Sequence, residues 1–590
     1  MRTALLKAAP LFASAAVMLG ASAVTAQREA GPVEGAVSGP VKTETVRALD
    51  PEETTVRLML GLGDPAPRVW SGRVKVDQGE VVGVDGGRFH AGDRVSGRDA
   101  WEARSVLVRK VAAKKAAAKK KANANAAAKP SGGPGTDGPG VAPNLITVRL
   151  KAPRDATLEV TTDQGEFRVP LADLAGGAPV LRLNNRVAVQ RVPAWAPLVD
   201  GEGQDDFPAA ASDGLGGAWV VYVEHRPKGP DALAAYTARP KDFSGLKPAG
   251  GGDQVKLVHI TDGKAETPID VTGPGLDVWR PSVVHGGFNM VSVVWSENRE
   301  GDFELYSKGY NPMTRALSAE FRVTNHPGTD CDAVLASTSS GPAWVAWQQW
   351  TDGRARVMVK PLTDPGPGQP AGDGVGNEWS PSIAVDGRGN PWVAFDSYAK
   401  GNYDVNLRRF TKDGQPDGPL VAVAESPRYE AHASVAVDPK GRAWVAYEER
   451  TENWGKDAEN LVTGSGTTLY RSSAVRVRCV DGGKVLDAPD PLAATPTNAP
   501  LRVMNSFPRL HCDARGRVWL AFRHRQEAIW GNNAVMVVGG VWLEYVSALA
   551  GEGWSYAVPV PASDNLLDNR PALVDRGEKS PLLVYSSDGR

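Results

Sequence analysis

The stretch 380–410, SPSIAVDGRGNPWVAFDSYAKGNYDVNLRRF, contains the repeat unit on which the fold depends. Its two apolar runs, PSIAV and WVAF, flank a polar DGRGN segment, and a third run follows a glycine. Pro381 is followed eleven residues later by Trp392, and Phe395 comes three residues after that. Short runs of β-branched and aromatic residues between Gly, Asp and Asn are typical of antiparallel strands joined by tight turns. The stretch therefore predicts a small meander of β-strands.

The same register returns seven times between Trp195 and Arg590. The position of Pro381 is taken in turn by Pro208, Pro281, Ala333, Pro381, Ala433, Pro508 and Pro571. The position of Trp392 is taken in turn by Trp219, Ser292, Trp344, Trp392, Trp444, Trp519 and Leu582. The offset within a unit is constant, whereas the distance from one unit to the next varies between 48 and 75 residues. A constant hairpin with variable outer strands is typical of the blades of a β-propeller.

A single four-stranded sheet buries both of its faces only by stacking on neighbouring sheets, and radial stacking also protects the sheet edges. We therefore predict an all-β protein with a seven-bladed β-propeller over residues 193–590. The repeated tryptophans are interpreted as core between blades rather than as a ligand-stacking cage. Because the seventh unit ends just after its second strand, we expect N-terminal material near Val187 to Val199 to complete that sheet.

The first 26 residues have the three parts of a secretory signal peptide. Arg2 and Lys7 supply a positive start, an apolar run covers 11–20, and the small residues VTA precede Gln27. The alternative, a membrane anchor, needs about 20 apolar residues, which this run does not reach and no later stretch provides. The pattern predicts a periplasmic or secreted protein without a membrane span.

Two further regions precede the repeats. Residues 27–50 are polar and without periodicity, so we expect a flexible lead-in. Residues 51–192 alternate in short runs and predict a small antiparallel, sandwich-like β domain, interrupted by a disordered insert at 104–143. The insert contains VRKVAAKKAAAKKKANANAAAKP, a run of lysines with no acid nearby. It could hold an anionic polymer, but alanine offers neither stacking nor an apolar face, which favours a solvated excursion from the domain.

Composition excludes several classes of function. Lys plus Arg number 67 against 68 Asp plus Glu, a net charge of −1, which argues against a generally basic nucleic-acid binder. The 65 Gly and 45 Pro imply many turns, in keeping with an all-β fold. Three Cys exclude a disulfide framework or a four-Cys zinc site, and no P-loop, HExxH or serine-hydrolase motif is present. We therefore expect no metal, no cofactor and no nucleic-acid partner.

The units at 380–410 and 280–310 resemble the blades of TolB-like and related secreted bacterial β-propellers. More closely, the stretch from Trp195 to Arg590 resembles the propeller-bearing N-terminal part of large exported bacterial proteins of unknown function. The C-terminal part of those proteins is related to PHP-type metal-dependent phosphoesterases. We expect that domain to be absent here, because the chain ends at YSSDGR and its eight histidines include no His-x-His pair. A metal-hydrolase activity is therefore not carried over from the resemblance.

Four aspartates stand in the turn between the first two strands of their units. Asp213, Asp386, Asp438 and Asp513 occur as D-x-x-G-x-x-W, one residue longer than the S-x-D-x-G-x-x-W Asp box of sialidases. Asp side chains bond nearby backbone amides, and glycine takes the positive φ that such turns need. We interpret these aspartates as turn formers in preference to calcium ligands.

The candidate binding site is the mouth of the central channel. Strand periodicity of two places the residues three and one before each proline position on the channel face, and the residue two after it between blades. Residues just after the aromatic end of each second strand, Asp396 among them, return to the same mouth. The candidate ligand-binding residues are Asp205, Arg280, Asp330, Asp332, Glu378, Glu430, His432, Arg509, His511, Asp568 and Arg570. The alternative is a solvated rim in which these acids pair with the arginines.

Two classes of function remain open. In the first, the chain is a non-catalytic binding module or interaction scaffold whose channel mouth takes an anionic glycan or a protein partner. Arg280, Arg509 and Arg570 would then form a cationic patch suited to a carboxylate or sulfate. In the second, it is a propeller glycosidase or lyase acting on an anionic polysaccharide. Glycosidic catalysis needs two carboxylates about 5.5 Å apart, or roughly 6.5 to 9.5 Å, a geometry that sequence does not reveal. The oligomeric state stays open.

Overall fold

The computed structural model describes residues 45–48, 54–60, 69–86, 94–96, 100–104, 144–226, 252–452, 472–563 and 570–587, apart from short gaps. The expected signal peptide at 1–26 and nearly all of the insert at 104–143 lie outside these ranges. The described part is all-β, with antiparallel sheets and only short 3₁₀ turns. This confirms the all-β part of the predicted fold.

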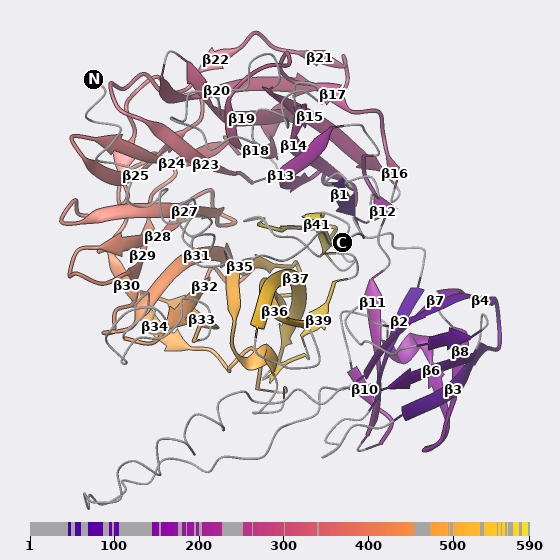
Figure 1. The fold of residues 1–590 in the computed structure, drawn as a ribbon. Helices are drawn as coiled ribbons and strands as arrows, with labels where there is room; N and C mark the ends of the chain where they lie inside the picture. Colours follow the sequence, from indigo (N-terminus) through magenta and orange to yellow (C-terminus); the bar gives the residue numbers. More distant parts are fainter. Residues whose placement is uncertain are drawn as a thin grey trace, which may run out of the picture.

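Seven of the nine sheets in the described part share one strand order (Figure 1). Their inner strands are β13 (Gln204–Ser212), β18 (Val278–Gly286), β23 (Asp330–Ala336), β27 (Asn377–Val385), β31 (Tyr429–Val437), β35 (Asn505–Cys512) and β40 (Ala572–Val574). Their second strands are β14 (Ala218–Arg226), β19 (Met290–Arg299), β24 (Trp344–Thr351), β28 (Pro391–Tyr398), β32 (Ala443–Arg450), β36 (Val518–Trp530) and β41 (Leu582–Ser587). We number these ring sheets 1 to 7 in the order of their inner strands.

Each ring sheet continues outward with a third strand and one or two short outer strands. The third strands are β15 (Gly252–Thr261), β20 (Asp302–Asn311), β25 (Arg354–Pro361), β29 (Asp404–Arg409), β33 (Ala474–Asp481), β37 (Met536–Ala550) and β1 (Thr45–Ala48). The outer strands are β16 (Lys264–Ala265), β17 (Ile269–Asp270), β21 (Ala316–Leu317), β22 (Phe321–Arg322), β26 (Gln369–Pro370), β30 (Val421–Ala424), β34 (Lys484–Asp487), β38 (Gly553–Trp554), β39 (Val558–Pro559) and β12 (Ala196–Pro197). Successive inner strands contact one another from β13 to β40, and β40 contacts β13, so the inner strands form a closed ring.

The apolar residues of the repeat pack between neighbouring ring sheets. Trp344 of ring sheet 3 shares a core cluster with Val393 and Phe395 of ring sheet 4. Trp444 of ring sheet 5 likewise packs with Phe522 of ring sheet 6. The repeated tryptophans are all buried, which confirms that they are core residues.

The turn aspartates act as the sequence predicts. Asp213 Oδ1 accepts hydrogen bonds from the backbone N–H groups of Leu215 and Gly217, at 2.7 and 2.8 Å. Asp386, Asp438 and Asp513 accept the corresponding pairs of backbone hydrogen bonds in their own turns. Each carboxylate thus closes the turn between inner and second strands, and the turn-former interpretation is confirmed.

Ring sheet 7 is completed by a strand that the sequence analysis placed in the flexible lead-in. Thr45–Ala48, as β1, pairs antiparallel with β41 on one side and with β12 on the other. Of the expected segment Val187 to Val199, only Ala196–Pro197 joins this sheet, whereas Val187–Pro193 forms β11 of a different sheet. β1 therefore pairs with the edge of β41 that would otherwise be open. A four-residue strand is too short for its sequence periodicity to predict this pairing.

The two remaining sheets form a small sandwich between β1 and β12 in the chain. Their strand orders are β10-β11-β2-β7-β4 and β5-β6-β3-β8-β9. The strands are β2 (Thr54–Leu60), β3 (Val69–Val76), β4 (Glu80–Gly86), β5 (Arg94–Ser96), β6 (Ala100–Arg104), β7 (Asn144–Lys151), β8 (Thr157–Thr162), β9 (Gly165–Pro170), β10 (Val180–Arg182) and β11 (Val187–Pro193). Alternate residues of β2 and β8 point inward into a shared core, Val56 and Leu58 from one sheet and Leu158 and Val160 from the other.

Replacing Val46 by proline tests the closure of ring sheet 7. Because β1 lies between β41 and β12, a proline removes a backbone donor and strains a strand that has partners on both sides. We expect Val46→Pro to lower the melting temperature and to speed hydrogen exchange in Leu582–Ser587, while Val46→Ala leaves that exchange slow. Equal exchange in the two variants would show that β1 does not cover β41 in solution.

Candidate functional site

Six of the seven inner strands bulge at the residue before the proline position of the repeat. In ring sheets 1 to 6, the pairing with the second strand shifts at this point. The bulged residues have φ between +38° and +56°, and they are Phe207, Arg280, Asp332, Ser380, His432 and Phe507. A left-handed conformation costs a non-glycine residue about 1 to 2 kcal/mol, so its return in six sheets indicates that the surroundings hold it in place.

The bulge shifts the register between the inner and second strands by one residue, so strand periodicity does not carry across it. The residues two after the proline position pack between ring sheets, as the sequence predicts, and they also line the central cavity. These residues are Ala210, Val283, Leu335, Ile383, Val435, Leu510 and Leu573.

The acids three before the proline position do not line the cavity. Asp205, Asp330, Glu378 and Glu430 are each at most 2% exposed and do not line the cavity, so the predicted ring of acids at the mouth is wrong. Glu378 accepts a hydrogen bond from Val357 N at 3.1 Å, and Glu430 accepts one from Ser426 N at 3.1 Å. Through these hydrogen bonds, each carboxylate links the start of its inner strand to another segment of the chain.

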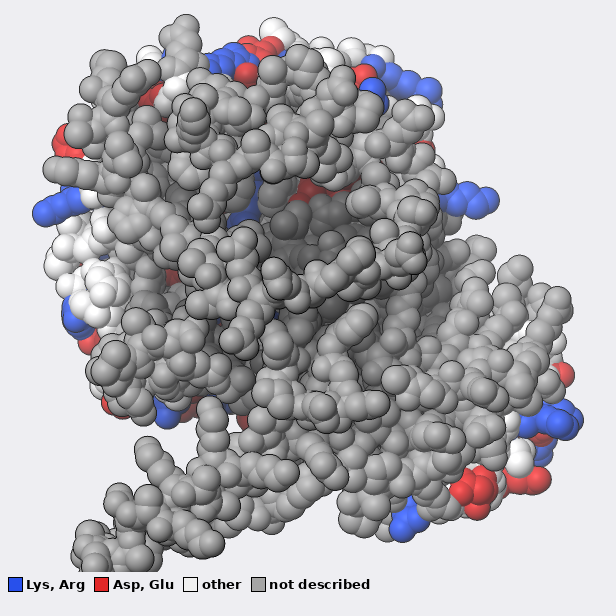
Figure 2. Space-filling view, viewed as in Figure 1, with Lys and Arg blue, Asp and Glu red and all other residues white. Residues whose placement is uncertain are grey.

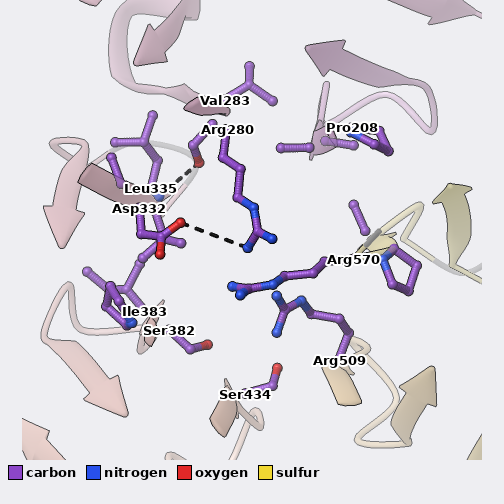
Figure 3. Close-up of a pocket in the computed structure, with 18 of the residues that line it drawn as sticks. Pro208, Arg280, Val283, Asp332, Leu335, Ser382, Ile383, Ser434, Arg509 and Arg570 are labelled. Carbon is purple, nitrogen blue, oxygen red and sulfur yellow. Dashed lines mark hydrogen bonds and ion pairs between the residues drawn. The ribbon is translucent and has the colours of Figure 1, made fainter. Parts of the chain in front are cut away.

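The central cavity holds the predicted cluster of arginines. It has a volume of about 240 Å³ and is lined by residues from all seven inner strands or the residues next to them. Arg280, Arg509 and Arg570 contribute their guanidinium groups, which converge on the cavity centre in Figure 3. Asp332 is the one carboxylate among the described residues of the lining, and its Oδ1 lies 3.9 Å from Arg280 Nη1. Figure 2 shows both kinds of charge at the wall of the central hollow.

Aromatic rings hold Arg280 and Arg570 in place. The guanidinium carbon of Arg280 lies 4.9 Å from the ring centroid of Trp279 and 5.7 Å from that of Phe207. That of Arg570 lies 5.3 Å from the centroid of Phe507. A guanidinium stacked on an aromatic face loses little of its hydrogen-bonding capacity, because its N–H groups point outward in its own plane. Arg280 and Arg570 are therefore positioned to donate into the cavity.

Buried carboxylates of ring sheets 4 and 5 hold the bulges of the sheets that follow them. Asp396 accepts hydrogen bonds from His432 N at 2.9 Å and from Ala433 N at 3.2 Å. Glu448 accepts one from Phe507 N at 2.7 Å. Burial raises the pKa of Asp396 to about 6. The two acids thus link neighbouring ring sheets at the level of the cavity.

Glu448 is also the centre of a charged cluster. Its Oε1 lies 2.8 Å from His432 Nδ1, and its Oε2 accepts a hydrogen bond from Arg450 at 2.8 Å. Burial opposes ionisation, yet the charges of His432 and Arg450 hold the pKa of Glu448 well below its ordinary value. Sequence reasoning missed Glu448, although it follows Trp444 by four residues as Asp396 follows Trp392.

Serine hydroxyls tie the inner strands together beside the cavity. Ser282, Ser382 and Ser434 each follow a proline position and line the cavity. Their hydroxyl oxygens accept backbone N–H bonds from the next inner strand, at 3.0 to 3.1 Å. The donors are Leu335, Val435 and Leu510. These bonds fix the spacing of the strands that carry the arginines.

The remaining candidates lie elsewhere. His432 packs its ring on Phe507, with centroids 4.4 Å apart. His511 is partly buried, and its Nε2 lies 3.8 Å from Asp575 Oδ1. Asp568 lies outside the described residues. Of the eleven predicted site residues, Arg280, Asp332, Arg509 and Arg570 therefore meet in one cavity.

The described residues contain no group of three or more His, Cys, Asp and Glu side chains arranged to hold a metal ion. They also contain no helix with the length and apolar character needed to cross a membrane.

No family model and no curated protein matches the chain. The resemblance to TolB-like propellers therefore stays a prediction. Among solved structures, a protein of unknown function from Dyadobacter fermentans is similar at 9% identity and a TM-score of 0.35, over 66% of this chain and 96% of that one. An α-L-arabinanase from Penicillium chrysogenum is similar at 12% identity and a TM-score of 0.31, over 53% of this chain and 93% of that one.

A polysaccharide lyase described as an ulvan lyase is similar at 11% identity and a TM-score of 0.30, over 74% of this chain and 85% of that one. At these scores and identities, none of the three similarities carries an argument about function.

Asp330→Asn tests the electrostatics of the buried acids. Burial, with the neighbouring charge of Glu304, raises the pKa of Asp330 from 3.8 to about 7. The folded protein therefore keeps a proton that the unfolded chain has already released, and the contribution of Asp330 to stability falls as pH rises from about 4 to about 7. An amide stays neutral and its oxygen can still accept the hydrogen bond from Trp347 Nε1. We expect Asp330→Asn to raise the melting temperature at pH 8 by roughly 2 °C or more.

This gain should shrink as the pH approaches 4, because the wild-type carboxyl is then neutral in the folded state. Asp352→Asn, in an exposed turn, is the matched control and should shift the melting temperature little at either pH. A loss of stability in Asp330→Asn at pH 8 would show that the buried group is held ionised.

Proposed function

We propose that the chain is an exported seven-bladed β-propeller that binds an anionic group, the carboxylate or sulfate of a glycan, in its central cavity without transforming it. The observation that carries this proposal is the convergence of three guanidinium groups beside one carboxylate in a cavity of about 240 Å³. The seven ring sheets and their closed inner ring support the blade count. Export rests on the N-terminal sequence pattern alone.

The charge balance of the cavity favours an anion. Three like charges that point at a common centre repel one another, and Asp332 is the one carboxylate among the described lining residues. An anion at the centre would receive charge-assisted hydrogen bonds from planar guanidinium forks, which suit the geometry of carboxylate and sulfate oxygens. The aliphatic residues Val283, Leu335 and Ile383 in the same lining provide an apolar wall around that centre. A cavity of this size fits an anionic group with its adjoining ring rather than a folded partner.

The arrangement supports binding better than catalysis. A glycosidase of the usual kind needs two carboxylates facing the scissile bond, whereas Asp332 is alone among the described lining residues. Glu378 and Glu430, the acids that the sequence placed at the mouth, accept backbone hydrogen bonds away from the cavity. The glycosidase or lyase remains the alternative, and it would have to use Asp332.

The double variant Arg280→Ala/Arg570→Ala tests the anion site. We expect its affinity for inorganic sulfate and for acidic glycans, measured by calorimetry, to fall about tenfold or more, since hydrogen bonds to charged groups are lost. Arg168→Ala on the sandwich, whose side chain is mostly exposed, is the matched control for charge and should bind like wild type. Unchanged binding by the double variant would place the site elsewhere.

For Asp332→Asn, at the same site, we expect the opposite change in affinity. The amide removes the single negative charge of the described lining, and its oxygen can still accept the hydrogen bond from Trp279 Nε1. We expect the affinity for sulfate to rise a fewfold, with the gain reduced at high salt. If the wild-type chain instead degrades an acidic glycan and Asp332→Asn abolishes that turnover, the enzymatic alternative is correct.

A further inference from the structure

A chain of aromatic rings leads from the cavity outward over ring sheets 6, 5 and 4. The rings, in this order, belong to Phe507, His432, Tyr429, Tyr403 and Tyr398, with successive centroids 4.4, 6.4, 5.1 and 5.0 Å apart. Trp379 joins its far end, 5.4 Å from Tyr403 and 6.3 Å from Tyr398. Its near end is Phe507, the ring on which the cavity residue Arg570 stacks.

All of these rings lie at one end of their sheets. Tyr398 is the last residue of β28, and Trp379 and Tyr429 are close to the first residues of β27 and β31. Because the inner and second strands are antiparallel, the start of one and the end of the other lie at the same end of the sheet. The bulged residues, Arg280 among them, also lie near the start of their inner strands, and Arg570 directly precedes β40. The aromatic chain therefore lies at the same end of the ring sheets as these two cavity arginines.

The far end of the chain reaches the surface. Tyr398 is 37% exposed, while Tyr429 in the middle is buried and packs as core. Val375, in the turn that precedes β27, is 68% exposed. That turn packs closely on the end of β28, since a Cβ on Gly376 would come within 2.6 Å of Ala399 N. Trp379 and Tyr403 are half-buried. We call Trp379, Tyr398 and Tyr403 the aromatic shelf.

The surroundings of the aromatic shelf are charged and polar. Lys400 forms an ion pair with Glu425, and the exposed Arg428 lies 3.2 Å from Glu449 Oε1. A partly exposed aromatic surface with polar groups at its rim suits a ligand that is itself amphipathic. Sugar rings are such ligands, because one face presents C–H groups and the edge presents hydroxyls. An extended peptide would instead use the open edge of a strand, whereas these rings stand at strand ends.

We propose that the aromatic shelf is a second subsite for sugar rings of the ligand whose anionic group occupies the cavity. The ligand is then an acidic oligosaccharide of several units, anchored by Arg280, Arg509 and Arg570 and stacked on Tyr398 and its neighbours. This inference rests on the proposed function for the position of the anion. Four ring-to-ring steps separate Phe507 from Tyr398, so a single sugar does not touch both subsites.

The test measures how affinity depends on the length of the saccharide and on the aromatic shelf. The full chain is titrated by calorimetry with galacturonate, mannuronate and sulfated galactose, each as monomer, dimer, tetramer and hexamer. We expect at least one series to gain affinity with length. For the hexamer of that series, Tyr398→Ala should lose about five- to tenfold in affinity, a loss that is typical of one aromatic contact, while monomer affinity stays unchanged.

Two matched variants separate stacking from folding. Tyr398→Phe keeps the ring and should bind the hexamer like wild type. Phe321→Ala removes an aromatic side chain of similar exposure, 43%, from the outer strand β22 and should also bind like wild type. As a measurement on the wild-type chain, the hexamer but not the monomer should slow hydrogen exchange in residues 398–404.

The outcomes distinguish the two proposals. If monomers bind the cavity but every hexamer binds equally well to wild type and Tyr398→Ala, the aromatic shelf is not a subsite and the cavity proposal stands. Stacking of an acidic peptide on Tyr398, without any gain from the saccharides, would also overturn the sugar assignment. If the wild-type chain binds neither inorganic sulfate nor any acidic sugar, the proposed function fails, and the two-part ligand fails with it.

Discussion

The left-handed bulge before the proline position is the constraint on which the centre of the ring depends. Among the bulged residues, Phe207, Arg280 and Asp332 line the cavity, and apolar residues that follow the bulges complete its wall. Such a backbone conformation persists only where neighbours over-determine it. Asp396 and Glu448 supply that support in ring sheets 5 and 6 through hydrogen bonds to the bulged amides. The same bonds join successive sheets, so ring stability and site geometry have a common origin.

Charge in this protein is used in two different ways. Away from the cavity, buried acids such as Glu378 and Glu430 accept hydrogen bonds from backbone N–H groups and so link neighbouring segments of the chain. At the centre, guanidinium groups stack on aromatic rings and keep their N–H groups directed inward. A carboxylate in a low-dielectric interior is tolerated where it is hydrogen-bonded, whereas clustered cations call for an anion. This contrast is the physical reason to look for the ligand at the centre.

Closure of the ring involves the sandwich as well as the last repeat. The chain contributes β1 to ring sheet 7, forms the sandwich, and returns to the same sheet as β12. The pairing of Ala48 with Ala196 brings the two ends of the inserted domain together. Of the two strands that flank the inserted domain, β1 thus covers the edge of β41, which would otherwise present unpaired backbone groups, and β12 covers β1 in turn.

The sequence by itself determined the β class, the repeat register, the tryptophan core and the turn aspartates, because each follows from local periodicity and turn chemistry. It also named Arg280, Arg509 and Arg570 as a cluster. Only the tertiary structure decided which residues face the cavity, since a bulge that shifts the strand register depends on hydrogen bonds with another sheet, such as the one that Phe507 N donates to Glu448. It likewise decided that Thr45–Ala48 closes ring sheet 7, because pairing between distant segments leaves no period in so short a strand.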